Sequence, residues 1–205
     1  MDAPGPFQDK TALRGEALCV ARGGRVLFED VSFRAKGGDY LEIRGANGAG
    51  KTSLLRAIAG FLAPRAGRVV FEGAEEPALA LHFVGHLNGL KGAASVASHL
   101  RYWAGLFGGA ATADVLERIG LRGYREAPAR ALSQGQQRRL ALARLLIAPR
   151  PVWLLDEPAA ALDDAGRAML TTAVDAHRAR GGLVLAAVHE ALGPAPSATI
   201  RLGRA

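Results

Sequence analysis

The residues best suited to chemistry form a glycine-rich loop, GANGAGKTS, at positions 45–53. Glycines let backbone N–H groups approach phosphate oxygens, and a following helix adds its positive N-terminal end. In the pattern G-x-x-x-x-G-K-T, Lys51 bridges the β- and γ-phosphates and the Thr52 hydroxyl ligates Mg²⁺. The alternative is a strand-to-helix turn with an incidental lysine. We predict that a nucleotide phosphate is bound by Gly45, Ala46, Asn47, Gly48, Ala49, Gly50, Lys51, Thr52 and Ser53.

Two acids follow the apolar stretch VWLL at positions 152–155. Ligand sites in open α/β sheets lie beyond the carboxyl ends of the strands, so Asp156 and Glu157 are expected beside the glycine-rich loop. Asp156 suits the coordination sphere of Mg²⁺, usually through water, and Glu157 suits a general base or a group that orients water. The alternative is a helix N-cap with two solvated acids.

A third stretch, LSQGQQRR at positions 132–139, begins another helix. Ser133 has the character of an N-cap, and the backbone around Gly135 opens the helix. This end would be a second anion-binding terminus in the same chain. Taken alone, the stretch is also what an ordinary capped helix requires.

The elements that position these residues follow from the apolar pattern. Alternating residues predict strands at 17–21, 25–33, 39–45, 67–73 and 79–85, interrupted by one helix from Thr52 to Gly60. The pattern becomes helical over about 95–131, again after Ser133 and at 163–180, with strands that are apolar on both faces at 152–155 and 182–188. Such strands indicate a parallel sheet covered on both sides, so we predict an α/β fold. We expect one domain over 1–205, with a helical lobe inserted at about 91–131.

Composition sets limits on the class of protein. The 205 residues suffice for one well-buried domain, with 49% hydrophobic and 22% charged residues. No apolar stretch approaches the roughly 20 residues that span a bilayer, and residues 1–17 lack the apolar core of a secretory signal. The single cysteine, Cys19, fits a reducing compartment. The net charge of +7 invites nucleic-acid binding, but the basic residues are scattered, so we expect no direct nucleic-acid contact.

The order of five motifs resembles that of the ABC-type ATPases: GANGAGKTS, LSQGQ, LLDEP, ALD at 161–163 and VHE at 188–190. The resemblance covers nearly the whole chain and implies a P-loop fold with an antiparallel β subdomain, using ATP and Mg²⁺. It also implies a head-to-tail homodimer in which the signature acts across the interface, with Ser133, Gly135 and Gln136 on the γ-phosphate. Asp163 would signal between sites, and His189 would contact the γ-phosphate from its own subunit. The signature residues are Leu132, Ser133, Gln134, Gly135 and Gln136.

A closer resemblance is to the ATPase subunits of the bacterial haem exporter of cytochrome c maturation, the CcmA family. It is carried by LFEDVSF, GANGAGKTSLLRAIAGFLAPRAG, LSQGQQRRLALARL and, most of all, by VGH followed by GLK. Most ABC ATPases have glutamine where His86 stands. Because imidazole is a poor ligand for hard cations, we expect His86 to be a sensor rather than a metal ligand.

This family resemblance implies integral membrane partners and a peripheral place on the cytoplasmic face of the inner membrane. ATP hydrolysis would energise haem delivery or release of a haem-loaded chaperone. We expect no haem ligand in this chain. The alternatives are the ATPase of another small exporter and a soluble ABC protein acting on nucleic acid or ribosomes. Where many ABC ATPases stack adenine on an aromatic ring, this chain has no ring, and Arg22 is the candidate to cover the base.

Overall fold

The computed structural model describes residues 7, 11–74, 76–109 and 113–203. The elements are β1 (Ala12–Arg22), β2 (Arg25–Lys36), β3 (Tyr40–Gly45), α1 (Lys51–Ile58), β4 (Ala66–Glu72), α2 (Pro77–Ala80), β5 (Leu81–Val84), α3 (Val96–Phe107), α4 (Ala113–Arg118), the short 3₁₀ helices η1 (Arg122–Tyr124) and η2 (Ala129–Ala131), α5 (Gln134–Leu142), α6 (Arg144–Ile147), β6 (Val152–Asp156), α7 (Asp164–Ala179), β7 (Leu183–Ala187) and β8 (Ala198–Leu202).

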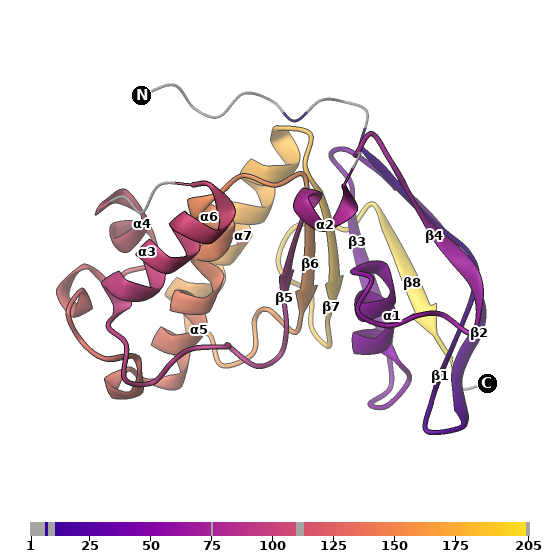
Figure 1. Ribbon diagram of the computed structural model, residues 1–205, viewed down its shortest axis with the longest axis horizontal. Helices are drawn as coiled ribbons and strands as arrows, with labels where there is room; N and C mark the ends of the chain where they lie inside the picture. The colour runs from indigo at the N-terminus through magenta and orange to yellow at the C-terminus, as the bar shows by residue number, and fades with distance from the viewer. Residues whose placement is uncertain (1–6, 8–10, 75, 110–112, 204–205) are drawn as a thin grey trace.

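Five strands form a parallel sheet in the order β5-β6-β7-β3-β8 (Figure 1). The register pairs Val84 with Leu155 and Asp156 with Ala187. The strands that precede the predicted functional loops therefore end at one edge of the sheet. The predicted α/β class with a mainly parallel core is confirmed.

The central strands are apolar on both faces because each face has its own core. In β7, Leu183, Leu185 and Ala187 pack into the core on the α1 side, whereas Val184 and Ala186 pack under α7. This alternation follows from the period of two along a strand. A buried strand with two packed faces is what the uninterrupted apolar run predicted.

Helix α1 lies between the parallel sheet and a second, antiparallel sheet of order β2-β1-β4 (Figure 1). Leu54, Leu55 and Ile58 of α1 are almost fully buried in a core shared with Leu13 of β1 and Phe28 of β2. The antiparallel sheet thus covers the outer side of the helix that follows the glycine-rich loop. It fixes that helix from the face opposite the parallel sheet.

Helices α3 to α6 gather beside α7, on the far side of the parallel sheet from α1 (Figure 1). Val96, Leu100 and Trp103 of α3 form a third apolar core with Leu140 of α5 and Ile147 of α6. Ser95 caps α3 by accepting a hydrogen bond from the N–H of Ser98 at 3.2 Å. None of the described helices has the length and apolar character needed to cross a bilayer.

Three elements differ from the sequence-based expectation. The helix α2 lies where only strand was predicted, so the expectation of a single helix in the first 90 residues was wrong. The helix after Ser133 ends at Leu142, and a new helix begins at Arg144, whose Nε donates to the Ala141 carbonyl at 2.8 Å beside the break. Strand β8 was not predicted; only two of its five residues are buried.

Two buried histidines stabilise the fold as neutral rings. His177 of α7 stacks on Trp153 with ring centroids 3.9 Å apart, and its Nε2 lies 3.2 Å from the Pro151 carbonyl. His82 of β5 donates from Nε2 to the Ala148 carbonyl at 2.7 Å. Burial lowers the pKa of His177 to about 3 and that of His82 to about 4.

These shifts predict acid sensitivity. Both folded pKa values lie below the unfolded value near 6.5, so the unfolded chain binds more protons as pH falls. The free energy of unfolding is fully retained above pH 6.5 and should fall by up to about 1.4 kcal/mol per pH unit and per histidine toward pH 4. Urea denaturation at several pH values measures this slope. His177→Gln, which keeps a donor for Pro151 but does not titrate, should flatten it; an unchanged slope would contradict the assignment.

Candidate active site

The glycine-rich loop connects the end of β3 to the start of α1. Gly50 is the N-cap of α1 and has φ 101°, a left-handed conformation that residues with a Cβ rarely adopt. A Cβ there would also lie 2.8 Å from the Phe28 ring, and one at Gly45 would lie 2.5 Å from the Leu202 carbonyl. The loop is therefore packed too closely for side chains at these two positions. Within the loop, the Ala49 N–H donates to the Ala46 carbonyl at 3.1 Å.

Lys51 is the first residue of α1 and is only 7% exposed. Its Nζ donates to the carbonyl of Gly45 at 2.8 Å and to that of Ala46 at 3.3 Å. The ammonium group is thus tethered across its own loop. A nucleotide phosphate entering the loop would meet a positive charge that is already in place.

Thr52 and Asp156 meet beside the loop. The Thr52 hydroxyl lies 3.0 Å from both carboxylate oxygens of Asp156, which is 2% exposed at the end of β6. A hydroxyl and a carboxylate are hard oxygen donors, and Mg²⁺ is usually held by one or two such groups together with waters and substrate phosphates. No cluster of three or more His, Cys, Asp or Glu suited to a metal occurs in the described chain. The pair fits a magnesium ion that completes its ligands with the nucleotide.

Glu157 has a left-handed backbone and lies between two imidazole rings. Its φ of 47° is unusual for a residue with a Cβ and costs on the order of 1–3 kcal/mol. His189 Nε2 lies 2.9 Å from Oε1, and His86 Nδ1 lies 3.6 Å from Oε2. An ionised carboxylate only accepts, so the His189 nitrogen donates. The structure thus brings three predicted residues together, and a carboxylate so placed can orient water or accept its proton.

A cavity of about 290 Å³ opens over the loop. Arg22 of β1 lies on its wall, so the structure places this residue beside the loop, while its predicted contact with adenine stays a prediction. Leu27 of β2 also lies there and was missed, because an isolated leucine in a strand carries no distinctive signal. The lining residues are Arg22, Leu27, Asn47, Gly48, Gly50, Lys51, Thr52, Ser53 and Glu157.

The signature residues do not line this cavity. Ser133 and Gln136 form a capping box at the start of α5: the Ser133 Oγ accepts from the Gln136 N–H at 3.2 Å, and the Gln136 side chain accepts from the Ser133 N–H at 2.9 Å. Leu132 is buried in the third core, whereas Gln134 is exposed. Within one copy of the chain, the signature therefore lies outside the cavity over the glycine-rich loop.

Asp163 caps α7 and lies close to the signature helix. Its Oδ1 accepts from the N–H of Gly166 at 2.9 Å, and its Oδ2 is 3.9 Å from Arg139 of α5. The Ala161 carbonyl approaches Gly135 so closely that a Cβ on that glycine would lie 2.8 Å from it. The segment 161–163 and the signature are thus in direct contact.

The chain matches known proteins over most of its length. The ABC transporter family model matches residues 28–160. A cytochrome c biogenesis ATP-binding export protein CcmA from Rhodopseudomonas palustris (strain BisB5) is 46% identical, covering 94% of this chain and 98% of the relative. One of the same name from Agrobacterium fabrum is 45% identical, covering 88% and 90%. The chain belongs to the CcmA group of the ABC transporter family.

The ABC ATPase fold is also found among solved structures. A putative ABC transporter ATP-binding protein from Pyrococcus furiosus superimposes with a TM-score of 0.81 at 23% identity, covering 93% of this chain and 97% of that one. The predicted ABC-type fold is confirmed. The chain is an ABC-type ATPase, the ATP-binding subunit of an ABC transporter.

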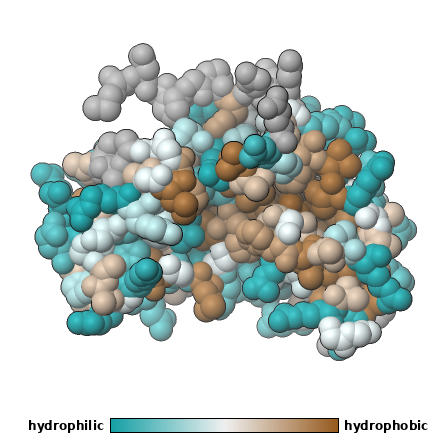
Figure 2. All heavy atoms as spheres, in the orientation of Figure 1, coloured by the Kyte–Doolittle hydropathy of each residue, from teal (hydrophilic) through white to brown (hydrophobic). Residues whose placement is uncertain are grey.

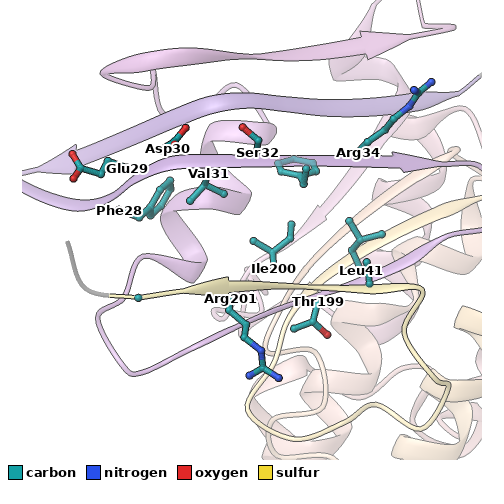
Figure 3. A pocket seen from close by; sticks show the side chains of 13 residues that line it. Phe28, Glu29, Asp30, Val31, Ser32, Arg34, Leu41, Thr199, Ile200 and Arg201 are labelled. Carbon is teal, nitrogen blue, oxygen red and sulfur yellow. The ribbon is translucent and has the colours of Figure 1, made fainter.

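A larger hollow of about 650 Å³ in this ABC ATPase contains none of the predicted site residues. It lies between β2 and β8, the facing edges of the two sheets, with Val31 and Ile200 directed into the gap and Arg201 directed away from it (Figure 3). If cavity volume alone decided where a ligand binds, this hollow would be chosen. The glycine-rich loop stays the predicted phosphate site, because loops of this kind bind phosphate through backbone N–H groups rather than by enclosure.

Arg138 is a second residue that sequence reasoning missed. It is 2% exposed within α5 and donates to the loops that follow β5 and β6. A signal for it exists in the sequence. Arg138 shares a helical face with Leu142 and Leu145, both buried, so an arginine occupies a core-facing position.

Lys51→Met should weaken ATP binding about 10- to 100-fold, because a charge-assisted contact to phosphate is worth roughly 1.5–3 kcal/mol. Isothermal titration calorimetry with a non-hydrolysed ATP analogue measures the affinity, and a thermal melt checks folding. The matched control is Arg201→Met, which removes a cation from strand β8 beside the β2–β8 hollow and should leave affinity unchanged. Loss of affinity in the control alone would move the nucleotide site to the hollow.

Proposed function

We propose that this chain hydrolyses ATP for an exporter of cytochrome c biogenesis, energising haem delivery or release of a haem-loaded chaperone. The observation that carries the proposal is the near full-length identity to relatives of that printed name, 46% over 94% of this chain in one case. The presence of His86 where most ABC ATPases have glutamine supports the same assignment to cytochrome c biogenesis.

In this proposal, Glu157 is the general base of hydrolysis. Water attacks the γ-phosphorus, the bond from that phosphorus to the bridging oxygen of ADP breaks, and Glu157 accepts the proton of the water. Lys51 and the loop N–H groups stabilise the charge on the phosphate oxygens. Mg²⁺, held by Thr52 and Asp156, supplies further charge neutralisation when bound. His189 orients the Glu157 carboxylate through their 2.9 Å contact and reaches the γ-phosphate from the same subunit.

Two copies of the chain share each site in this proposal. No residue of 132–136 lines the cavity over the loop within one copy of the chain. The N-terminal end of α5 carries the exposed residues Ser133 and Gln134, and an exposed helix start suits the phosphate of a second copy. Asp163 contacts the signature helix and, in this proposal, signals between the two ATP sites.

The proposed location is the cytoplasmic face of the inner membrane, where integral membrane subunits hold the ATPase. Side chains suited to that contact lie on the helical side: Tyr102 and Leu106 of α3 are 64% and 59% exposed. Their neighbours Trp103 and Phe107 pack inward, Trp103 as part of the third core and Phe107 edge-on to His82. Hydrophobic residues also gather across the middle of the face in Figure 2, and Leu87, beside His86, is 84% exposed.

Glu157→Gln should lower hydrolysis by about 10²- to 10⁴-fold, the usual contribution of a general base, and leave ATP binding intact. The variant should accumulate as an ATP-dependent dimer, seen by light scattering after gel filtration in Mg-ATP. Glu190→Gln is the control, because Glu190 is an exposed acid on the neighbouring loop, paired with Arg167 at 3.4 Å. Near-normal hydrolysis by Glu157→Gln would reject the base, and a strictly monomeric variant would reject the shared site.

Deletion of the gene should abolish holo-cytochrome c and leave b-type haem proteins at normal levels, as measured by haem staining and difference spectra. The wild-type gene should restore the c-type cytochromes, and a Glu157→Gln copy should not. Normal c-type cytochromes in the deletion strain would reject the cytochrome c role. The chain would then serve another exporter, or a soluble process on nucleic acid or ribosomes, with the ATPase chemistry unaffected.

A further inference from the structure

Arg138 holds the backbone around Glu157 from within the signature helix. Its Nη2 donates to the carbonyls of Asp156 and Glu157 at 2.9 and 2.8 Å, and its Nε donates to the Pro158 carbonyl at 3.1 Å. Three successive carbonyls thus accept from one guanidinium. The left-handed residue Glu157 is the middle one of the three.

The same guanidinium also holds the segment that carries His86. Its Nη1 donates to the Gly85 carbonyl at 2.8 Å and to Oδ1 of Asn88 at 3.2 Å. A guanidinium has five N–H donors in a planar fork, and all five have an acceptor here. Arg138 therefore sets the spacing between two segments whose side chains, His86 and Glu157, lie 3.6 Å apart.

The charge of Arg138 is met by backbone and amide dipoles at a buried position. Burial lowers the pKa of Arg138, while the nearby negative charges of Asp156 and Glu157 raise it. Burying a cation costs free energy that an apolar side chain of similar size would not cost. An apolar residue would fill this space without that cost. Arginine differs from such a residue in supplying five directed hydrogen-bond donors.

We propose that Arg138 is a positioning residue for ATP hydrolysis, which holds the strained backbone of Glu157 and the His86 segment in register with the signature helix. The inference rests on the proposed role of Glu157 as general base. Arg138 lies five residues after Ser133 on one continuous helix, a rise of about 7.5 Å. A displacement of the helix start by the phosphate of a second copy would thus be carried rigidly to the backbone of the base.

The test compares Arg138→Met and Arg138→Lys by steady-state ATPase assays. We expect Arg138→Met to lower kcat about 100-fold, the usual effect of misplacing a reacting group by about 1 Å, with the KM for ATP changed less than threefold. Arg138→Lys keeps the charge but has three donors in place of five, so it should retain an intermediate kcat. Both variants should still bind ATP, since neither alters Lys51.

The matched control is Arg144→Lys. Arg144 is a partly buried arginine that donates to the Asn88 carbonyl at 2.9 Å and lies 4.7 Å from the centroid of Trp103. The carbonyls of residues 156–158 are not among its acceptors. Its replacement should lower stability yet leave kcat within about twofold. An equal loss of kcat in Arg144→Lys would attribute the effect to general destabilisation and overturn the proposal.

A double variant, Glu157→Gln with Arg138→Lys, separates this inference from the proposed function. If Arg138 acts through Glu157, the double variant should be no slower than Glu157→Gln alone. A further loss of tenfold or more would mean that Arg138 acts independently, which overturns the inference. Normal kcat in Arg138→Lys and Arg138→Met would overturn it as well, even where Glu157→Gln is inactive. An active Glu157→Gln would instead reject the base. Hydrogen exchange at the amides of Asp156 and Glu157 in Arg138→Lys would then still show whether the guanidinium holds this segment. Faster exchange is expected, and unchanged exchange would count against the proposal.

Discussion

The parallel pairing of β6 with β5 and β7 is the constraint on which the site depends. Because parallel strands end at the same edge of a sheet, the pairing of Asp156 with Ala187 places the segments after β6 and β7 side by side. The 2.9 Å contact between Glu157 and His189 follows directly. A shift of one residue in the register of β6 would turn Asp156 to the opposite face and separate it from Thr52. Because β6 is apolar on both faces, its hydrophobic pattern alone does not set this register; specific contacts such as the stacking of Trp153 on His177, with ring centroids 3.9 Å apart, favour it.

The sequence predicted the parts of the site that depend on local pattern. A glycine-rich loop between an alternating strand and a helix, and two acids after a buried strand, are readable because their residue types and spacing carry the chemistry. The backbone conformation of Glu157 could not be predicted from the sequence, because glutamate has no preference for φ near +47° and only tertiary contacts hold it there. The core-facing position of Arg138 could have been predicted from its helical face, but its role could not, because that role depends on acceptors from segments far from it in the chain.

The fold, too, could be predicted from the sequence only where the local pattern decides the structure, and not where partners distant in the chain decide it. The central strands were predictable because both faces are apolar, whereas β8 buries only Ile200 and Leu202 and is a strand by virtue of pairing with β3. The aromatic stretch of α3 likewise could not be divided by sequence into core and surface. Trp103 and Tyr102 are adjacent, yet one is in the third core and the other is exposed. Their helical positions decide this only once the packing partners are known.

The acceptors of Arg138 are mainly backbone carbonyls, at positions 85, 156, 157 and 158. A carbonyl oxygen is the same whatever side chain its residue carries. Homologous chains can therefore vary the residues of these loops without changing the acceptors that the guanidinium meets. The hydrogen bonds of the guanidinium therefore constrain Arg138 itself and the path of the backbone, and they place no demand on the side chain at position 158.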